Sequence, residues 1–157
     1  LATAMSIKTL RIADVAEFAR PIQRAESWLA GRPARNTLDA CARLLTKVGD
    51  PQPALDLLRR GQGRDGGWGP YVDAPSEAFD TALAVLALTC APRNTDVSRM
   101  MTQGRSYLVV QQTEEGAWPE TTRPSGGESY AQRISTTGWA TLALLLSEKV
   151  HLDGAGP

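Results

Sequence analysis

The sequence is poor in the residues that most often carry catalysis or bind a metal. Its 157 residues include two cysteines and one histidine. Cys41 and Cys90 lie inside apolar helical patterns, so they do not predict a disulfide framework. The histidine, His151, lies beyond the last predicted helix, where it is a poor candidate for a catalytic base. We therefore expect no metal and no cofactor.

Net charge and long apolar runs are lacking as well. The 17 basic and 17 acidic residues cancel, and there is no basic stripe with interleaved aromatic residues, so no nucleic-acid partner is expected. The longest apolar runs, residues 82–88 and 140–146, are far too short to span a bilayer. The first residues lack the pattern of a signal peptide, and a cytoplasmic protein is predicted.

The sequence does contain one pattern that occurs twice, at a spacing of 50 residues. It consists of a Gln, three variable residues, a Gly, one further residue and a Trp. The pattern is formed by Gln62, Gly66 and Trp68, and again by Gln112, Gly116 and Trp118. A period of this size indicates one supersecondary unit that is copied along the chain.

An apolar helical pattern follows each of these elements, and a third copy of it precedes them. Thr37, Thr81 and Thr137 are each followed by Ala three residues later and by Leu seven residues later. These spacings place the residues on one helix face, where the small Ala lets a neighbouring helix come close. Asn36 and Asp80 immediately precede two of these Thr residues, and we expect them at an N-cap or in a first turn.

Start and stop signals place further helices between these copies. They are expected from Pro21 to Ala30, from Asp50 to about Arg60, and from Asn94 to Gln112 with an interruption near Gly104. No segment alternates as a β-strand does, so the sequence predicts an all-α fold of helical hairpins. The organisation expected is an N-terminal helical extension over 1–20, helical repeats over 21–148 and a flexible C-terminal tail over 149–157.

The two Gln-Gly-Trp elements are interpreted as structural staples between successive hairpins. A Gln at the end of a helix can donate its amide to backbone groups that the helix and the turn leave unpaired. The glycines permit backbone conformations that other residues resist, and each Trp buries a large flat surface where two hairpins meet. We therefore expect these residues to hold the fold together rather than to contact a ligand.

The segment 107–112, followed by Gly116 and Trp118, resembles the Gln-Trp repeat of squalene and hopene cyclases. The segment 64–69, followed by Asp80 and Thr81, is similar to that family and to the β subunits of protein prenyltransferases. The resemblance covers about residues 20–148 and implies an α/α toroid, with inner helices around a cavity and outer helices behind them. The family's ring has about six hairpins and this chain supplies about three, so half of it is missing or is completed by another chain or copy.

The acid of the cyclase family is not matched in this sequence. The family's Asp-x-Asp-Asp motif donates its proton from the third residue, and its last Asp aligns with Asp80, so Phe79 stands at the acid position. A phenyl ring cannot donate a proton. Arg35 and Ser135 occupy the matching positions of the other two copies, and neither supplies the acid.

The zinc ligands of the prenyltransferase family are missing too. Asp39 and Cys41 have the spacing of that family's ligand pair, but the pair should begin at Asn36. The family's histidine would fall near Thr136, far from His151. We interpret Cys41 as a buried thiol beside a first-turn Asp, and no zinc is predicted.

A scaffold without acid or metal ligands predicts a non-catalytic toroid-type repeat domain that binds a hydrophobic, isoprenoid-like ligand or a protein partner. The alternative is half of a terpenoid cyclase of the squalene or hopene type, whose catalytic acid lies outside this chain. The residues expected at the cavity are Tyr71, Phe79, Asp80 and Trp139. Because half a ring would expose an apolar edge, we expect a homo-oligomer or a complementary half-toroid chain.

Overall fold

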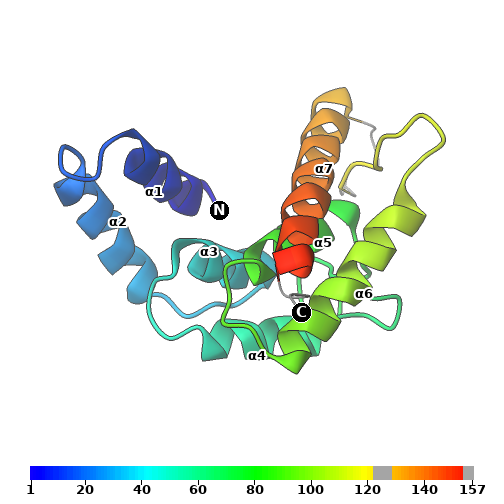
Figure 1. Cartoon of the computed structure of the whole chain (residues 1–157), viewed down its shortest axis with the longest axis horizontal. Coiled ribbons are helices and arrows are strands. Elements are labelled where there is room, and N and C mark those ends of the chain that lie inside the picture. The colour runs from blue at the N-terminus through cyan, green and yellow to red at the C-terminus, as the bar shows by residue number, and fades with distance from the viewer. Residues whose placement is uncertain (122–128, 154–157) are drawn as a thin grey trace.

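The fold consists of helices joined by turns and loops (Figure 1). A computed structural model describes residues 1–121 and 129–153, and in these residues it contains seven α-helices and no β-strand. The prediction of an all-α fold is therefore confirmed. No helix in this part of the chain has the length and apolar character needed to cross a membrane. The helices are α1 (Ala2–Ala13), α2 (Ala19–Ala30), α3 (Thr37–Thr46), α4 (Gln52–Gly61), α5 (Ala78–Leu88), α6 (Thr95–Gln111) and α7 (Tyr130–Asp153).

Helix α5 is the centre of the molecule. It packs against α3, α6 and α7 (Figure 1). Every residue of α5 except Phe79 is buried, which agrees with a sequence that is apolar on all faces. A helix of this kind is stable only when other helices surround it. As a result α3, α5 and α7 form a row with α5 in the middle.

A smaller apolar cluster covers one edge of this row. Helix α1 packs against α2 and α3, and α2 lies beside it (Figure 1). The buried members of the cluster are Ala4, Ile7, Ile22, Leu29 and Ala42. Ala42 belongs to α3, so this cluster attaches the N-terminal helices to the row. At the opposite edge α7 packs mainly against α5.

Asparagine side chains begin two of the helices. Asn36 precedes α3, and its side-chain oxygen accepts a hydrogen bond of 2.8 Å from the backbone N–H of Asp39. Asn94 precedes α6 and accepts a bond of the same length from the N–H of Val97. Each bond satisfies an N–H that a helix leaves unpaired at its start. Asp80 lies inside the first turn of α5, because that helix already begins at Ala78.

The interruption predicted near Gly104 is wrong, since α6 runs without a break from Thr95 to Gln111. A Cβ atom on residue 104 would lie 2.6 Å from Cζ3 of Trp68 and 2.6 Å from Cγ2 of Val85. Both neighbours are completely buried. The glycine is therefore explained by the close approach of α6 to the Trp68 ring and to α5, and not by a bend in the helix.

The ends of the chain differ in detail from the predicted boundaries. Helix α1 occupies most of residues 1–20, and α2 begins at Ala19, shortly before Pro21. Helix α7 continues to Asp153, so residues 149–153 are helical where the sequence predicts a flexible tail. Residues 154–157 lie outside the described part of the chain.

Candidate functional site

The first Gln-Gly-Trp element forms a compact hydrogen-bonded turn between α4 and α5. The side-chain amide of Gln62 donates to the carbonyl of Gly66 at 2.9 Å and to the carbonyl of Met100 in α6 at 2.9 Å. Gly66 has φ of 87°, a left-handed conformation that favours glycine. The indole N–H of Trp68 donates to the carbonyl of Leu58, near the end of α4, at 2.7 Å. This turn is therefore bonded to both α4 and α6.

The second element repeats these bonds between α6 and α7. The amide of Gln112 donates to the carbonyl of Gly116 at 3.0 Å, and Gly116 has φ of 79°. The indole N–H of Trp118 donates to the carbonyl of Leu108 at 2.7 Å. Both tryptophans are buried. Because their polar atoms are paired inside the protein, neither Trp offers a free N–H to a ligand.

A threonine in each of the helices α3, α5 and α7 is hydrogen-bonded to a loop. Thr81 of α5 accepts a hydrogen bond from the N–H of Trp68 at 2.8 Å, and Thr137 of α7 accepts one from the N–H of Trp118 at 3.1 Å. Thr37 of α3 donates to the carbonyl of Gly69 at 2.6 Å. The loop around Trp68 and Gly69 is thus bonded to the starts of both α3 and α5.

A pocket of about 320 Å³ lies at the N-terminal ends of these three helices. Its volume falls at the lower end of the range of small-molecule sites, about 300–1,000 Å³. The wall combines apolar side chains with an acid, an amide and hydroxyl groups. The lining residues are Leu38, Pro70, Phe79, Asp80, Thr121, Gln132, Ser135 and Thr136.

Asp80 is the acidic residue in the wall of this pocket. It is only 2% exposed, and its Oδ1 has no hydrogen-bond partner among the described residues. Burial, and to a lesser extent the nearby carboxylate of Glu77, raise the pKa of Asp80 to about 7. Asp80 is therefore partly ionised at neutral pH, in a position where water cannot easily solvate the charge.

Further oxygens near Asp80 are buried without a partner among the described residues. Oγ1 of Thr136 and Oε1 of Gln132 belong to residues that line the pocket, and Oε2 of Glu77 belongs to a residue outside the lining whose carboxylate acts on Asp80. Thr136 is only 1% exposed. Buried polar groups in proteins are nearly always hydrogen-bonded, so such a group of unpaired oxygens beside one pocket indicates a site for a ligand or for ordered water.

Cys41 lies on α3 close to this site, but its thiol is not reactive. It is completely buried, and burial raises the pKa of the Cys41 thiol far above its ordinary value, with a further contribution from the charge of Asp80. The carboxylate of Asp39, two residues before it, accepts a hydrogen bond from the N–H of Arg35 at 3.1 Å. Within the described residues, no three His, Cys, Asp or Glu side chains are placed to hold a metal ion.

The pocket brings together two of the four residues that the sequence places at a cavity. Phe79 and Asp80 line it, whereas Tyr71 is 62% exposed and Trp139 packs against the core outside the lining. The sequence does not single out Gln132 and Thr136 as site residues. A signal for Thr136 was present, because it precedes Thr137 as Asp80 precedes Thr81.

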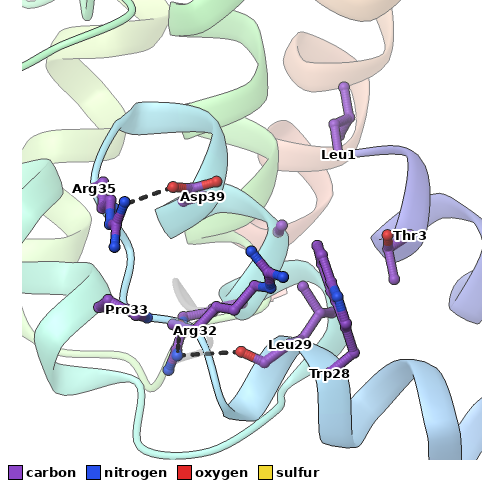
Figure 2. Close-up of a pocket in the computed structure, with 10 residues that line it drawn as sticks. Leu1, Thr3, Trp28, Leu29, Arg32, Pro33, Arg35 and Asp39 are labelled. Carbon is purple, nitrogen blue, oxygen red and sulfur yellow. Dashed lines mark hydrogen bonds between the residues drawn. The ribbon is translucent and has the colours of Figure 1, made fainter.

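A second pocket, of about 230 Å³, lies between α1, α2 and α3 (Figure 2). The guanidinium of Arg32 lies over the ring of Trp28, 4.4 Å from its centroid. Arg43 donates to the carbonyls of Leu29 at 3.2 Å and Ala30 at 3.3 Å. These contacts stabilise the connection from α2 to α3. No buried unpaired polar atom is found among the residues of this pocket, so the first pocket is the better candidate.

The sequence matches no known protein family, and no curated protein is recognisably similar to it.

Proposed function

We propose that this chain is a non-catalytic, toroid-type helical repeat domain that binds a hydrophobic small molecule with a polar end. The binding site is the pocket at the N-terminal ends of α3, α5 and α7. The observation that carries the proposal is that one pocket combines apolar wall residues with oxygens of Asp80 and Thr136 that have no hydrogen-bond partner in the described residues. Leaving a buried polar atom unpaired costs about 1–3 kcal/mol. A ligand that bonds to these oxygens removes this cost and also buries its own apolar surface.

The order of the helices supports the toroid. Helices α2, α4 and α6 each precede one helix of the row α3, α5 and α7. The connections after α4 and α6 contain the two Gln-Gly-Trp elements, which make corresponding hydrogen bonds. A row of inner helices, each preceded by an outer helix and contacting mainly its neighbours, is expected of about half of an α/α toroid.

The side chains of the pocket favour binding over catalysis. Phe79, at the position of the cyclase acid, lines the pocket and has no proton to donate. Asp80, with a pKa of about 7, is too weak an acid to protonate an alkene. The alternative is half of a terpenoid cyclase whose acid another chain supplies. Incubation with squalene or a prenyl diphosphate, followed by mass spectrometry of the products, separates the two: a cyclised product would establish the cyclase.

Ligand binding is tested by calorimetric titration with short isoprenoids that differ in their polar end. Ser135→Phe should fill the pocket, because Ser135 lines it and is exposed. Ser98→Phe is the matched control, since Ser98 is an exposed residue of α6 outside the lining. We expect at least one compound to bind, Ser135→Phe to weaken it by tenfold or more, and Ser98→Phe to leave it unchanged. Failure of every compound to bind would contradict the proposal.

An exposed apolar stripe on α7 supports association with a second copy of this chain. Ile134, Gly138, Thr141 and Leu145 follow one another at spacings of three and four residues, and all are exposed. When Thr137 is aligned with Thr81, the first three of these residues match Ala78, Ala82 and Val85 of α5, and all three are buried there. The other edge of the row is already covered by α1. We therefore propose that α7 packs against α7 of the second copy, because an uncharged apolar stripe is compatible with itself.

This association is measured by light scattering across a range of protein concentrations. The wild type should form a dimer, and Leu145→Glu should be a monomer because it places a charge in the stripe. Val110→Glu is the control, since Val110 is an exposed apolar residue of α6, 77% exposed, outside the stripe. A wild type that stays monomeric at high concentration would exclude the second copy as the occupant.

A further inference from the structure

The unpartnered oxygens near the pocket are mainly hydrogen-bond acceptors. In its ionised form, which a bound cation favours, the carboxylate of Asp80 can only accept, while the hydroxyl of Thr136 can accept or donate. The amide of Gln132 can turn either its oxygen or its NH₂ group toward the pocket, so Asp80 decides whether the ligand must donate or accept hydrogen bonds. A ligand that satisfies this group must therefore donate hydrogen bonds.

When Asp80 is ionised, its carboxylate forms no ion pair with any of the described residues. None of the residues that line the pocket is Lys, Arg or His. Leu38 lines the pocket from α3, and the residues that line it from α7 are uncharged: Gln132, Ser135 and Thr136. The neutral thiol of Cys41 lies close enough to feel the charges of both Asp80 and the N-terminal amino group, but that amino group is not part of the pocket wall. The ion pairs found in the described residues involve other acids, namely Glu26, Asp56, Asp96 and Glu115. A buried carboxylate without a cation is costly, and a hydroxyl group on a ligand would bond to it without neutralising it.

The rest of the wall suits an organic cation rather than a hydrated metal ion. Phe79 offers an aromatic ring beside Asp80, and a ring face attracts cations. Leu38 and Pro70 supply apolar contact for a carbon chain. A pocket of about 320 Å³ has room for a short amphiphile of this kind.

We infer that the pocket selects hydrophobic molecules that end in an ammonium group, which donates its hydrogen bonds to Asp80 and Thr136. The inference rests on the proposed ligand-binding function and adds the charge of the ligand to it. An ammonium group supplies three donors and one positive charge, so it satisfies both requirements of the site together. An alcohol satisfies only the first, and a carboxylate ligand is repelled.

Three probes with one carbon skeleton test the inference: geranylamine, geraniol and geranic acid, titrated into the purified full chain at neutral pH. Hydrogen bonds that involve a charged partner are stronger than neutral ones by an amount that corresponds to about tenfold or more in affinity. We therefore expect geranylamine to bind at least tenfold more tightly than geraniol, and geranic acid to bind most weakly.

The isosteric variant Asp80→Asn assigns the preference to Asp80. It should bring geranylamine and geraniol to within about twofold of each other, because a neutral amide does not discriminate a cation from an alcohol by charge. Asp73→Asn is the control: Asp73 is an exposed acid outside the pocket, so the variant removes one surface charge and should keep the preference. Circular dichroism of both variants checks that they are folded, and the wild-type comparison of the three probes does not depend on either.

Each result decides between the two proposals. Binding of geraniol or geranic acid as tightly as geranylamine would overturn the ammonium inference and leave the ligand-binding function standing. A preference for geranylamine that persists in Asp80→Asn would overturn the role of Asp80. If none of the three probes binds, and no other short isoprenoid does, the ligand-binding function itself fails.

Discussion

Replacement of Gly104 by alanine adds a single methyl group where α6 lies against Trp68 and α5. The added Cβ would lie 2.6 Å from a ring carbon of Trp68 and 2.6 Å from a methyl carbon of Val85. Both neighbours are completely buried side chains, so neither can move into solvent. Gly138 on α7 is the matched control, because a Cβ there would meet no atom within 4 Å.

The two substitutions should change the free energy of unfolding in opposite directions. In a helix, alanine is more favourable than glycine by about 0.5–1 kcal/mol, so Gly138→Ala should stabilise the protein by that amount. Gly104→Ala gains the same preference but forces an overpacked core, which costs about 1–3 kcal/mol. The preference for alanine is common to both variants, so we expect them to differ by the overpacking cost, about 1–3 kcal/mol, and Gly104→Ala to lose up to about 2 kcal/mol net.

Urea unfolding followed by tryptophan fluorescence measures this difference, since Trp68 lies at the contact. The protein should be dilute, because Gly138 lies in the apolar stripe proposed to mediate association. If Gly104→Ala is as stable as Gly138→Ala, then α6 does not approach Trp68 as closely as the structure indicates, and the packing argument for this glycine is refuted.

Three further perturbations test other parts of the structure. The folded pKa of Asp80, about 7, lies above the ordinary value of 3.8, so the stability that Asp80 contributes is complete below about pH 4 and is lost as the pH rises through 7. Urea unfolding of the wild type at a series of pH values should show this loss, and Asp80→Asn should not. Alanine at Gly66 or Gly116 should cost about 1–2 kcal/mol of stability, because both glycines have positive φ. Thermal unfolding should show the larger loss for Gly66→Ala, since the added Cβ also lies 2.6 Å from the carbonyl oxygen of Gln103. Trp118→Phe removes the indole N–H and leaves a buried carbonyl unpaired, so urea unfolding should show a loss of about 1–3 kcal/mol; an unchanged midpoint would contradict that bond.

The helices were predictable because their signals are local. Asn36 and Asn94 cap helices through bonds to the third residue after them, and the apolar pattern of α5 already requires burial on every side. The break predicted at Gly104 failed for a different reason. A glycine inside a helix can mark either a bend or a close contact, and only the position of the Trp68 ring, far away in the sequence, distinguishes the two.

The candidate site was only partly predictable. Phe79 and Asp80 were identified because the last two positions of the cyclase family's acid motif align with them, whereas Tyr71 was expected at the cavity by its aromatic side chain and is exposed instead. Gln132 and Thr136 show no unusual chemistry by residue type. Their importance arises because α7 packs beside α5 and leaves their oxygens buried, with no partner in the described residues, at the pocket that Asp80 also lines.

By itself the sequence determined the helical character of the chain and the positions of the two Gln-Gly-Trp elements, because helix periodicity, caps and turn glycines act over a few residues. Tertiary structure alone decided that Asp80 is buried without a counter-ion in the described residues, that a pocket forms beside it, and that one face of α7 remains uncovered. Burial, electrostatic environment and exposure depend on which distant segments meet, and local patterns do not contain that information.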